Sequence, residues 1–334
     1  MKSRRDFVKI LSGSGAALMF PLNLSANILE KREQKPLRFG LCADVHKDVM
    51  HDADLRLKAF IEEATVKDLD FIIQLGDFCR PYDYNQEFMS IWNSFPGDKY
   101  HVLGNHDMDG GFTRDQTVKY WNALGKNYSF DRDGYHFIVL DGNDKDPSPN
   151  SPSGYARYIG KEQLLWLEHD LEETKLPSII FSHQGLDNDL GGIYNATQTR
   201  LVLEQANEQA DFQKVQFVFS GHHHQDYYNN INGIHYIQIN SMSYQWLGDN
   251  YQHIRYSDEV DKSHPWIKYT VPYKEPIWAI AEISSDNIFR LYGSKTEFIG
   301  PSPEELGVDM HNFGYPIVPY ISDREIKLKY SKQH

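Results

Sequence analysis

Apolar runs of strand length recur along the chain, and polar residues follow them. Residues 37–43, 71–75 and 100–103 are typical of buried strands, and apolar side chains at helical spacing predict a helix over residues 54–69. Alternation of strand and helix in this half predicts right-handed crossovers and a largely parallel sheet.

The second half continues the pattern with a hairpin, a helix and further strands. Residues 242–275 interrupt it as an insertion rich in Tyr and Trp with weak periodicity. Such a segment suits an ordered cap over a site that stacks on a ligand, and it suits a packed extension of the core equally well. The other expected elements are the hairpin 128–141, the helix 161–173 and the strands 178–181, 215–220, 234–240, 277–284 and 288–298.

Composition favours one large folded domain. With 334 residues and 40% hydrophobic content, the chain can bury a single core. We expect that domain over residues 37–300, with a C-terminal tail at 301–334. The net charge of −13 argues against binding of a nucleic-acid polymer, which requires a basic surface. Only Cys42 and Cys79 are present, and two buried thiols are favoured over a disulfide between them.

The N-terminus has the pattern of a targeting segment. Two arginines within residues 3–9, followed by a short apolar run at 10–20, resemble a twin-arginine export signal, which would occupy residues 1–27 with a linker at 28–36. This predicts recognition by the twin-arginine export machinery and a periplasmic or otherwise exported bacterial protein. A basic amphipathic helix on a cytoplasmic protein is the alternative. The apolar run is too short for a stable membrane anchor.

Metal-binding side chains follow five of the predicted strands. Because ligands bind at the carboxyl ends of strands in open α/β sheets, these side chains should converge. Residues two apart on extended backbone point the same way, so His223 should face away from the site. Imidazole and carboxylate groups without thiolate suit divalent Mn, Fe or Zn, and about seven ligands imply two ions. The residues are Asp44, His46, Asp77, Asn105, His106, His183, His222 and His224.

The motifs in this region resemble a known family signature. Asp-x-His, Gly-Asp, Gly-Asn-His-Asp, a lone His and Gly-His-x-His occur in that order between Asp44 and His224, as in calcineurin-like metallophosphoesterases. The resemblance implies an α/β fold, a four-layer αββα sandwich with two central mixed β-sheets. It implies a hydrolase for a small phosphorylated substrate, with phosphomonoester and phosphodiester near even.

The resemblance also assigns roles to individual residues. A hydroxide bridging two divalent ions would attack phosphorus in line, and His106 would assist the leaving group. Asp107 would orient the His106 ring, with a plain turn residue as the alternative. Two close cations repel, so a carboxylate is expected between them. The metal ligands would be Asp44, His46 and His224 for one ion, Asn105, His183 and His222 for the other, and Asp77 as the bridge.

One position departs from a branch of this family. Purple acid phosphatases place a tyrosine ligand three residues after the bridging aspartate, and Arg80 stands there in this chain. A guanidinium does not ligate metals, so Arg80 suits a contact with the substrate phosphate or a structural salt bridge. A non-catalytic metal-binding interaction module is the competing function. It predicts a missing ligand or acid, and every motif position is filled.

Overall fold

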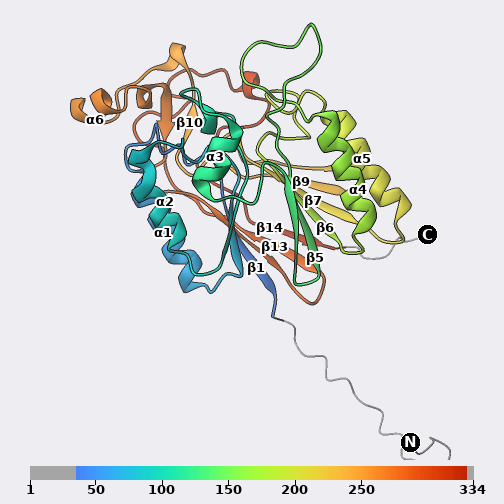
Figure 1. The fold of residues 1–334 in the computed structure, drawn as a ribbon. Coiled ribbons are helices and arrows are strands. Elements are labelled where there is room, and N and C mark those ends of the chain that lie inside the picture. Colours follow the sequence, from blue (N-terminus) through green and yellow to red (C-terminus); the bar gives the residue numbers. More distant parts are fainter. Residues whose placement is uncertain (1–34, 329–334) are drawn as a thin grey trace, which may run out of the picture. The chain divides into compact units, whose positions relative to one another are not determined.

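The fold of residues 35–328, the part that the computed structural model describes, consists of two β-sheets packed face to face with helices on their outer sides (Figure 1). The expected export signal at residues 1–27 lies outside the described residues. The linker at 28–36 lies outside them up to residue 34, and the tail at 301–334 lies outside them from residue 329. Within the described range, no helix combines the length and apolar character needed to cross a bilayer.

The first sheet has six strands and mixed direction. β1, β2 and β3 run parallel to one another, and β12, β13 and β14 extend the sheet from β1, each antiparallel to its neighbour. In spatial order the strands are β14 (Arg324–Lys327), β13 (Ile288–Tyr292), β12 (Ala279–Ile283), β1 (Leu37–Cys42), β2 (Phe71–Gln74) and β3 (Asp98–His101).

The second sheet is also mixed. Its four central strands β5, β6, β7 and β9 are parallel, and the edge strands β4 and β8 are antiparallel to their neighbours. The parallel arrangement expected for the first half holds for β1, β2 and β3, and antiparallel neighbours extend the parallel strands of both sheets, which makes both sheets mixed as expected. In spatial order the strands are β4 (Tyr128–Arg132), β5 (Tyr135–Val139), β6 (Ser178–Ser182), β7 (Val215–Ser220), β9 (Ile234–Gln238) and β8 (Tyr228–Ile231).

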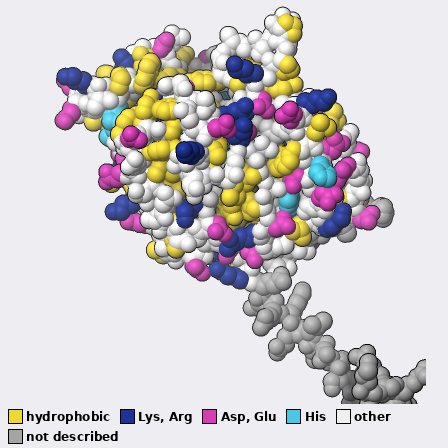
Figure 2. Space-filling model, in the orientation of Figure 1, with side chains coloured by type: hydrophobic (Ala, Val, Ile, Leu, Met, Phe, Trp, Pro, Cys, Tyr) yellow, Lys and Arg dark blue, Asp and Glu magenta, His cyan; other side chains and the backbone are white. Residues whose placement is uncertain are grey.

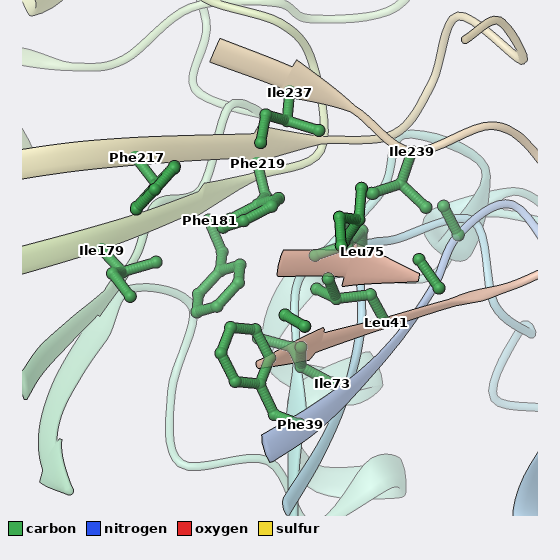
Figure 3. Close-up of a cluster of buried hydrophobic side chains, with 14 of the residues drawn as sticks. Phe39, Leu41, Ile73, Leu75, Ile179, Phe181, Phe217, Phe219, Ile237 and Ile239 are labelled. Carbon is green, nitrogen blue, oxygen red and sulfur yellow. The ribbon is translucent and has the colours of Figure 1, made fainter. Parts of the chain in front are cut away.

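The central strands of both sheets are rich in apolar residues because both of their faces are buried. Side chains such as Phe39, Ile73 and Phe181 fill the core between the sheets, as Figure 3 shows. The intervening Ile72 packs into the core beneath the helices of the first sheet, and Ile180 packs into that of the second. Three apolar cores between four layers confirm the αββα sandwich.

Helices cover the outer face of each sheet (Figure 1). Helix α4 buries Leu164, Leu167 and Leu171, the stripe that predicted it, whereas α5 buries Thr199 beside Leu203 and so has a weak apolar stripe. The helices are α1 (Ala53–Val66), α2 (Gln86–Asn93), α3 (Arg114–Trp121), α4 (Lys161–Glu173), α5 (Ala196–Gln209) and α6 (Asp258–Ser263). Short 3₁₀ helices lie at Asp83–Asn85, His106–Met108, Asp249–Tyr251, Ile267–Tyr269 and Met310–Phe313.

The aromatic insertion is partly core and partly surface. Its strands β10 (Tyr244–Trp246) and β11 (Thr270–Pro272) form a two-stranded sheet, in which Tyr244 is buried and Trp246 is exposed. On the face shown in Figure 2, hydrophobic side chains gather near where Figure 1 draws β10. Residues after 300 return to the domain, because β14 pairs with β13 in the first sheet.

Both cysteines are buried and free, as expected. Cys42 ends β1, and the Cys79 thiol lies 3.7 Å from the sulfur of Met89. Burial raises the pKa of both thiols, so each behaves as a small apolar side chain.

Candidate metal centre

The loops that follow β1, β2, β6 and β7 bring six of the predicted ligands together. Their side chains form two groups, and within each group the donor atoms all lie within 4.8 Å of one another. All six residues belong to the set predicted from the strand ends. The first group is Asp44, His46 and His224, and the second is Asp77, His183 and His222.

Asp77 lies between the two groups. Its Oδ2 atom is 3.2 Å from His183 Nε2 in its own group and 3.7 Å from His46 Nε2 in the other. In the first group, His224 Nε2 lies 3.1 Å from His46 Nε2 and 3.2 Å from Asp44 Oδ1. The Asp77 carboxylate is therefore placed where one oxygen can serve two neighbouring cations.

Backbone carbonyls fix two of the imidazole rings. His183 Nδ1 donates a hydrogen bond to the carbonyl oxygen of Leu75, and His224 Nδ1 donates to that of Tyr244, each at 2.7 Å. Because a carbonyl only accepts, Nδ1 carries the proton in both rings. Nε2 is therefore the nitrogen of each ring that faces its group and can bind a metal ion.

Asn105 provides the test of whether a cation fits. Its side chain is buried, and neither amide atom has a hydrogen-bond partner among residues 35–328. Buried polar atoms without partners are costly and rare in native proteins. An oxygen-binding cation beside Asn105 would satisfy its carbonyl oxygen, so the site fits a bound metal.

The backbone at this site is strained. A positive φ is uncommon outside glycine and costs on the order of 1–3 kcal/mol for each residue. Left-handed turns, and not the alternation of an extended strand, therefore aim the Asp-x-His and His-x-His pairs. His223 belongs to neither group, as expected. The residues in this conformation are Asp44, His46, Asp77, His222 and His224, with φ between 51° and 73°.

Burial and charge set the protonation of these side chains. Burial lowers the pKa of His46 and His222 well below the usual range, which keeps both rings neutral. Burial opposes ionisation of Asp77, but the nearby His183 and His106 outweigh it and hold its pKa well below normal. For His183, burial is outweighed by Asp77, which raises the pKa to about 9. A cation bound there would displace that proton.

His106 projects into the same region but is held by a different acid from the one expected. Its Nδ1 atom lies 2.8 Å from Asp109 Oδ2 and 3.1 Å from the Tyr155 hydroxyl, which also donates to Asp109 at 3.0 Å. Burial lowers the pKa of His106, and Asp77 and Asp109 outweigh it to raise the pKa. Asp109 follows His106 by three residues, whereas nothing in the sequence pattern pointed to Tyr155.

Asp107 therefore does not orient the His106 ring. Its buried carboxylate accepts hydrogen bonds from the backbone nitrogens of Gly104, Asp77 and Phe78, at 2.8, 2.9 and 2.7 Å. These bonds tie the loop after β3 to the loop after β2. The correct role is that of an anchor for the loops that carry Asn105 and Asp77.

The metal-binding groups open into a cavity of about 600 Å³. Arg80 lines it, with Nε 3.6 Å from Asp48 Oδ2, so the side chain has an ion-pair partner and still reaches the cavity. Tyr155, Trp246 and Trp266 line the same space.

Comparison with known proteins agrees with this geometry. The family model described as calcineurin-like phosphoesterase matches residues 37–226, and no curated protein sequence matches significantly. A dimetal phosphatase from Danio rerio superposes with a TM-score of 0.57 and 16% identity, covering 80% of this chain and 100% of its own. GAP50, the anchor in the inner membrane complex of Plasmodium, superposes with a TM-score of 0.51 and 17% identity, covering 80% of this chain and 89% of its own. At these identities, the two structures establish the fold alone.

The family match spans more than half of the chain, from β1 through the last metal-binding histidine. All five motif blocks lie within it, and the loops that carry them meet at one site. The chain belongs to the calcineurin-like phosphoesterase family, and it is a hydrolase that acts on phosphoester bonds.

Proposed function

We propose that this protein hydrolyses a small phosphate ester at a centre that holds two divalent metal ions. The observation that carries the proposal is the position of Asp77 Oδ2, within 3.7 Å of a histidine nitrogen from each group of ligands. Phosphomonoester and phosphodiester substrates remain equally open. No observation favours a non-catalytic binding module, since each motif position holds its expected residue.

The two ligand groups divide the chain's donor atoms between the ions. Their imidazole and carboxylate donors suit Mn, Fe or Zn. Two bound ions would neutralise charge on the phosphoryl oxygens and lower the pKa of a water molecule towards neutrality. In this proposal Asp44, His46 and His224 hold one ion, His183, His222 and Asn105 hold the other, and Asp77 contributes to both.

His106 and Arg80 would act on the substrate. With His106 Nδ1 engaged by Asp109, the Nε2 atom is the ring nitrogen left to protonate the departing oxygen or bind the phosphate. Arg80 lines the cavity and can donate to a phosphoryl oxygen through its guanidinium group.

Metal content and turnover together test the proposal. The purified chain should bind two ions and hydrolyse a chromogenic monoester or diester with Mn, Fe or Zn. His183→Ala and His224→Ala, one from each group, should each lose an ion and at least 100-fold in kcat, because the remaining ion cannot do both tasks. His169→Ala, exposed on α4, is the matched control. A chain that binds one ion, or two ions without turnover of either ester, would overturn the proposal.

We also propose that residues 1–27 direct twin-arginine export to the periplasm. The support is the sequence alone, in the paired Arg4 and Arg5 and the short apolar run after them. Replacing both arginines by lysine should retain the protein in the cytoplasm. An unchanged distribution after cell fractionation would remove this proposal and leave the hydrolase proposal intact.

A further inference from the structure

Strand β10 leads from the metal centre to an exposed tryptophan. The Tyr244 ring stacks on His46 with centroids 5.0 Å apart, and its carbonyl oxygen accepts the hydrogen bond from His224. Trp246 is two residues further along, on the same side of the strand and advanced by about 6.6 Å. Its side chain is 40% exposed. An indole ring therefore stands beside the metal-binding groups.

Trp246 belongs to a row of three aromatic rings. Tyr269 lies between the two indoles, with its centroid 5.6 Å from Trp246 and 5.6 Å from Trp266. Trp266 is 54% exposed, although tryptophan is highly buried on average. The backbone nitrogen of Leu247 donates to the Tyr269 carbonyl at 2.9 Å and holds the row together. Both indoles are thus supported by a neighbour and still exposed.

The row lies on the wall of the cavity that contains the metal-binding groups. Trp246 and Trp266 line the same space of about 600 Å³ as His106 and Asp77. A cavity of this size accommodates a small organic molecule, which is larger than a phosphate group alone. A phosphate held at the metal-binding groups would leave the rest of its substrate facing the tryptophans.

The charges around the cavity indicate an uncharged leaving group. Among the described residues that line the cavity, Arg80 is the only lysine or arginine. Beyond Arg80 and the proposed ions, the described lining has no lysine or arginine to pair with further phosphates, and Asp48 and Asp109 would repel them at close range. The acidic lining residues are Asp48, Asp77, Asp107 and Asp109.

The hydrogen-bonding capacity of these carboxylates favours a flat ring over a hydroxyl-rich one. Asp48 already accepts from the backbone nitrogen of Arg80, the Tyr84 hydroxyl and the Asn85 amide, at 2.8, 3.1 and 3.0 Å. Asp109 is engaged by His106 and Tyr155. Sugar hydroxyls would lose hydrogen bonds to water without finding these groups free, whereas an aromatic ring gains by stacking on an indole.

We propose that the substrate is a phosphate ester whose leaving group carries a flat aromatic ring, and that this ring stacks on Trp246 and Trp266. The inference rests on the proposed phosphoester hydrolysis and specifies its substrate class. A nucleobase and a simple aryl group share this chemistry.

Relative kinetics of matched variants test the proposal. The substrates are phenyl phosphate for an aryl ring, adenosine 5′-monophosphate for a nucleobase, glucose 6-phosphate for a sugar and glycerol phosphate for neither. Trp246→Ala and Trp266→Ala should each lower kcat/KM for a ring-bearing ester about tenfold relative to kcat/KM for glycerol phosphate. The loss should appear as a higher KM. Comparing each variant with wild type cancels the intrinsic reactivity of the leaving groups. Trp246→Phe should retain most of the preference, and Tyr292→Ala, with a similarly exposed ring on β13, should retain all of it.

Binding of non-hydrolysable phosphonates gives a readout that does not require turnover. By calorimetry, metal-loaded protein should bind phenylphosphonate about tenfold tighter than methylphosphonate, and Trp246→Ala should abolish the difference. If this holds while no ester is hydrolysed, the ring site stands and the proposed function fails. Turnover with equal affinity for the two phosphonates would overturn the ring site alone. A preference for glucose 6-phosphate that the tryptophan variants lose would also overturn it, in favour of a sugar.

Discussion

Asp107 Oδ2 accepts a hydrogen bond at 2.9 Å from the backbone nitrogen of Asp77, the residue that lies between the two metal-binding groups. The neighbouring nitrogen of Phe78 and that of Gly104 donate to the same carboxylate. One buried side chain therefore holds two loops of the metal centre in register.

Removing this carboxylate should damage the fold before it damages the chemistry. Asp107→Ala leaves three buried backbone N–H groups without an acceptor, at about 1–3 kcal/mol each. We expect the free energy of unfolding, measured by urea denaturation, to fall by roughly 3 kcal/mol or more. Asp107→Asn keeps one carbonyl oxygen, so its free energy of unfolding should lie between those of wild type and Asp107→Ala. A wild-type midpoint for Asp107→Ala would contradict the anchoring role.

Asp109 and Tyr155 should show the opposite behaviour. Both contact the Nδ1 side of His106 and are partly exposed, so Asp109→Asn and Tyr155→Phe should unfold like wild type. Because His106 loses its orientation, kcat should fall about tenfold in Asp109→Asn, against roughly 100-fold or more in His106→Ala.

The order of those effects is the test. Stability of each variant is measured beside its kcat and KM on the same substrate, with wild-type metal content as the control. Full activity in His106→Ala would show that His106 does not act on the substrate. A large loss of stability in Asp109→Asn would show that Asp109 supports the fold and does not merely orient His106.

A methyl group at Gly104 should displace the Asp77 carboxylate. An added Cβ would lie 2.1 Å from the Asp77 backbone nitrogen and 2.2 Å from its Oδ1. We expect Gly104→Ala to cost about 1–3 kcal/mol and to reduce bound metal. Gly111→Ala is the matched control, since an added Cβ there meets nothing within 4 Å and costs only about 1 kcal/mol for its positive φ. Equal metal content in the two variants would argue against steric displacement.

The sequence predicted elements best where one physical signal dominates. The leucine stripe of α4 and the largely apolar run of β7 predicted the observed bounds of both elements, 161–173 and 215–220. Strand β3 begins two residues earlier than expected, because its first residues are polar and the apolar Val102 and Leu103 lie beyond its end. Helix α5 was not predicted, since Thr199 and Asn207 occupy part of its buried face.

In the candidate site, too, some residues carried a sequence signal and others did not. Its ligands could be identified because motif residues follow strands whose ends meet in space. The contact between Tyr155 and His106 could not be predicted, since Tyr155 comes from a loop 49 residues away and no periodicity marks it. The left-handed backbone of Asp44 and His222 was equally hidden, because aspartate and histidine carry no local signal that requires that conformation.

His136 should make the stability of the second sheet depend on pH. Its Nδ1 atom lies 2.6 Å from Asp131 on β4, and its Nε2 lies 2.9 Å from Asp170 on α4. Burial lowers the pKa of this imidazole, but the hydrogen bonds to Asp170 and Asp131 outweigh burial and raise it above 6.5. The protonated ring donates to both carboxylates and so joins the edge hairpin to the helix.

Because the folded-state pKa is raised, this stabilisation is fully present below the unfolded-state value and is lost as the pH rises through the folded-state value. His136→Gln should therefore lose more stability relative to wild type at pH 5.5 than at pH 9. Urea unfolding of both proteins at the two pH values measures the difference. His169→Gln, on the exposed face of α4, is the matched control. An equal loss at both pH values would mean that the neutral ring, through packing alone, accounts for the contribution of His136.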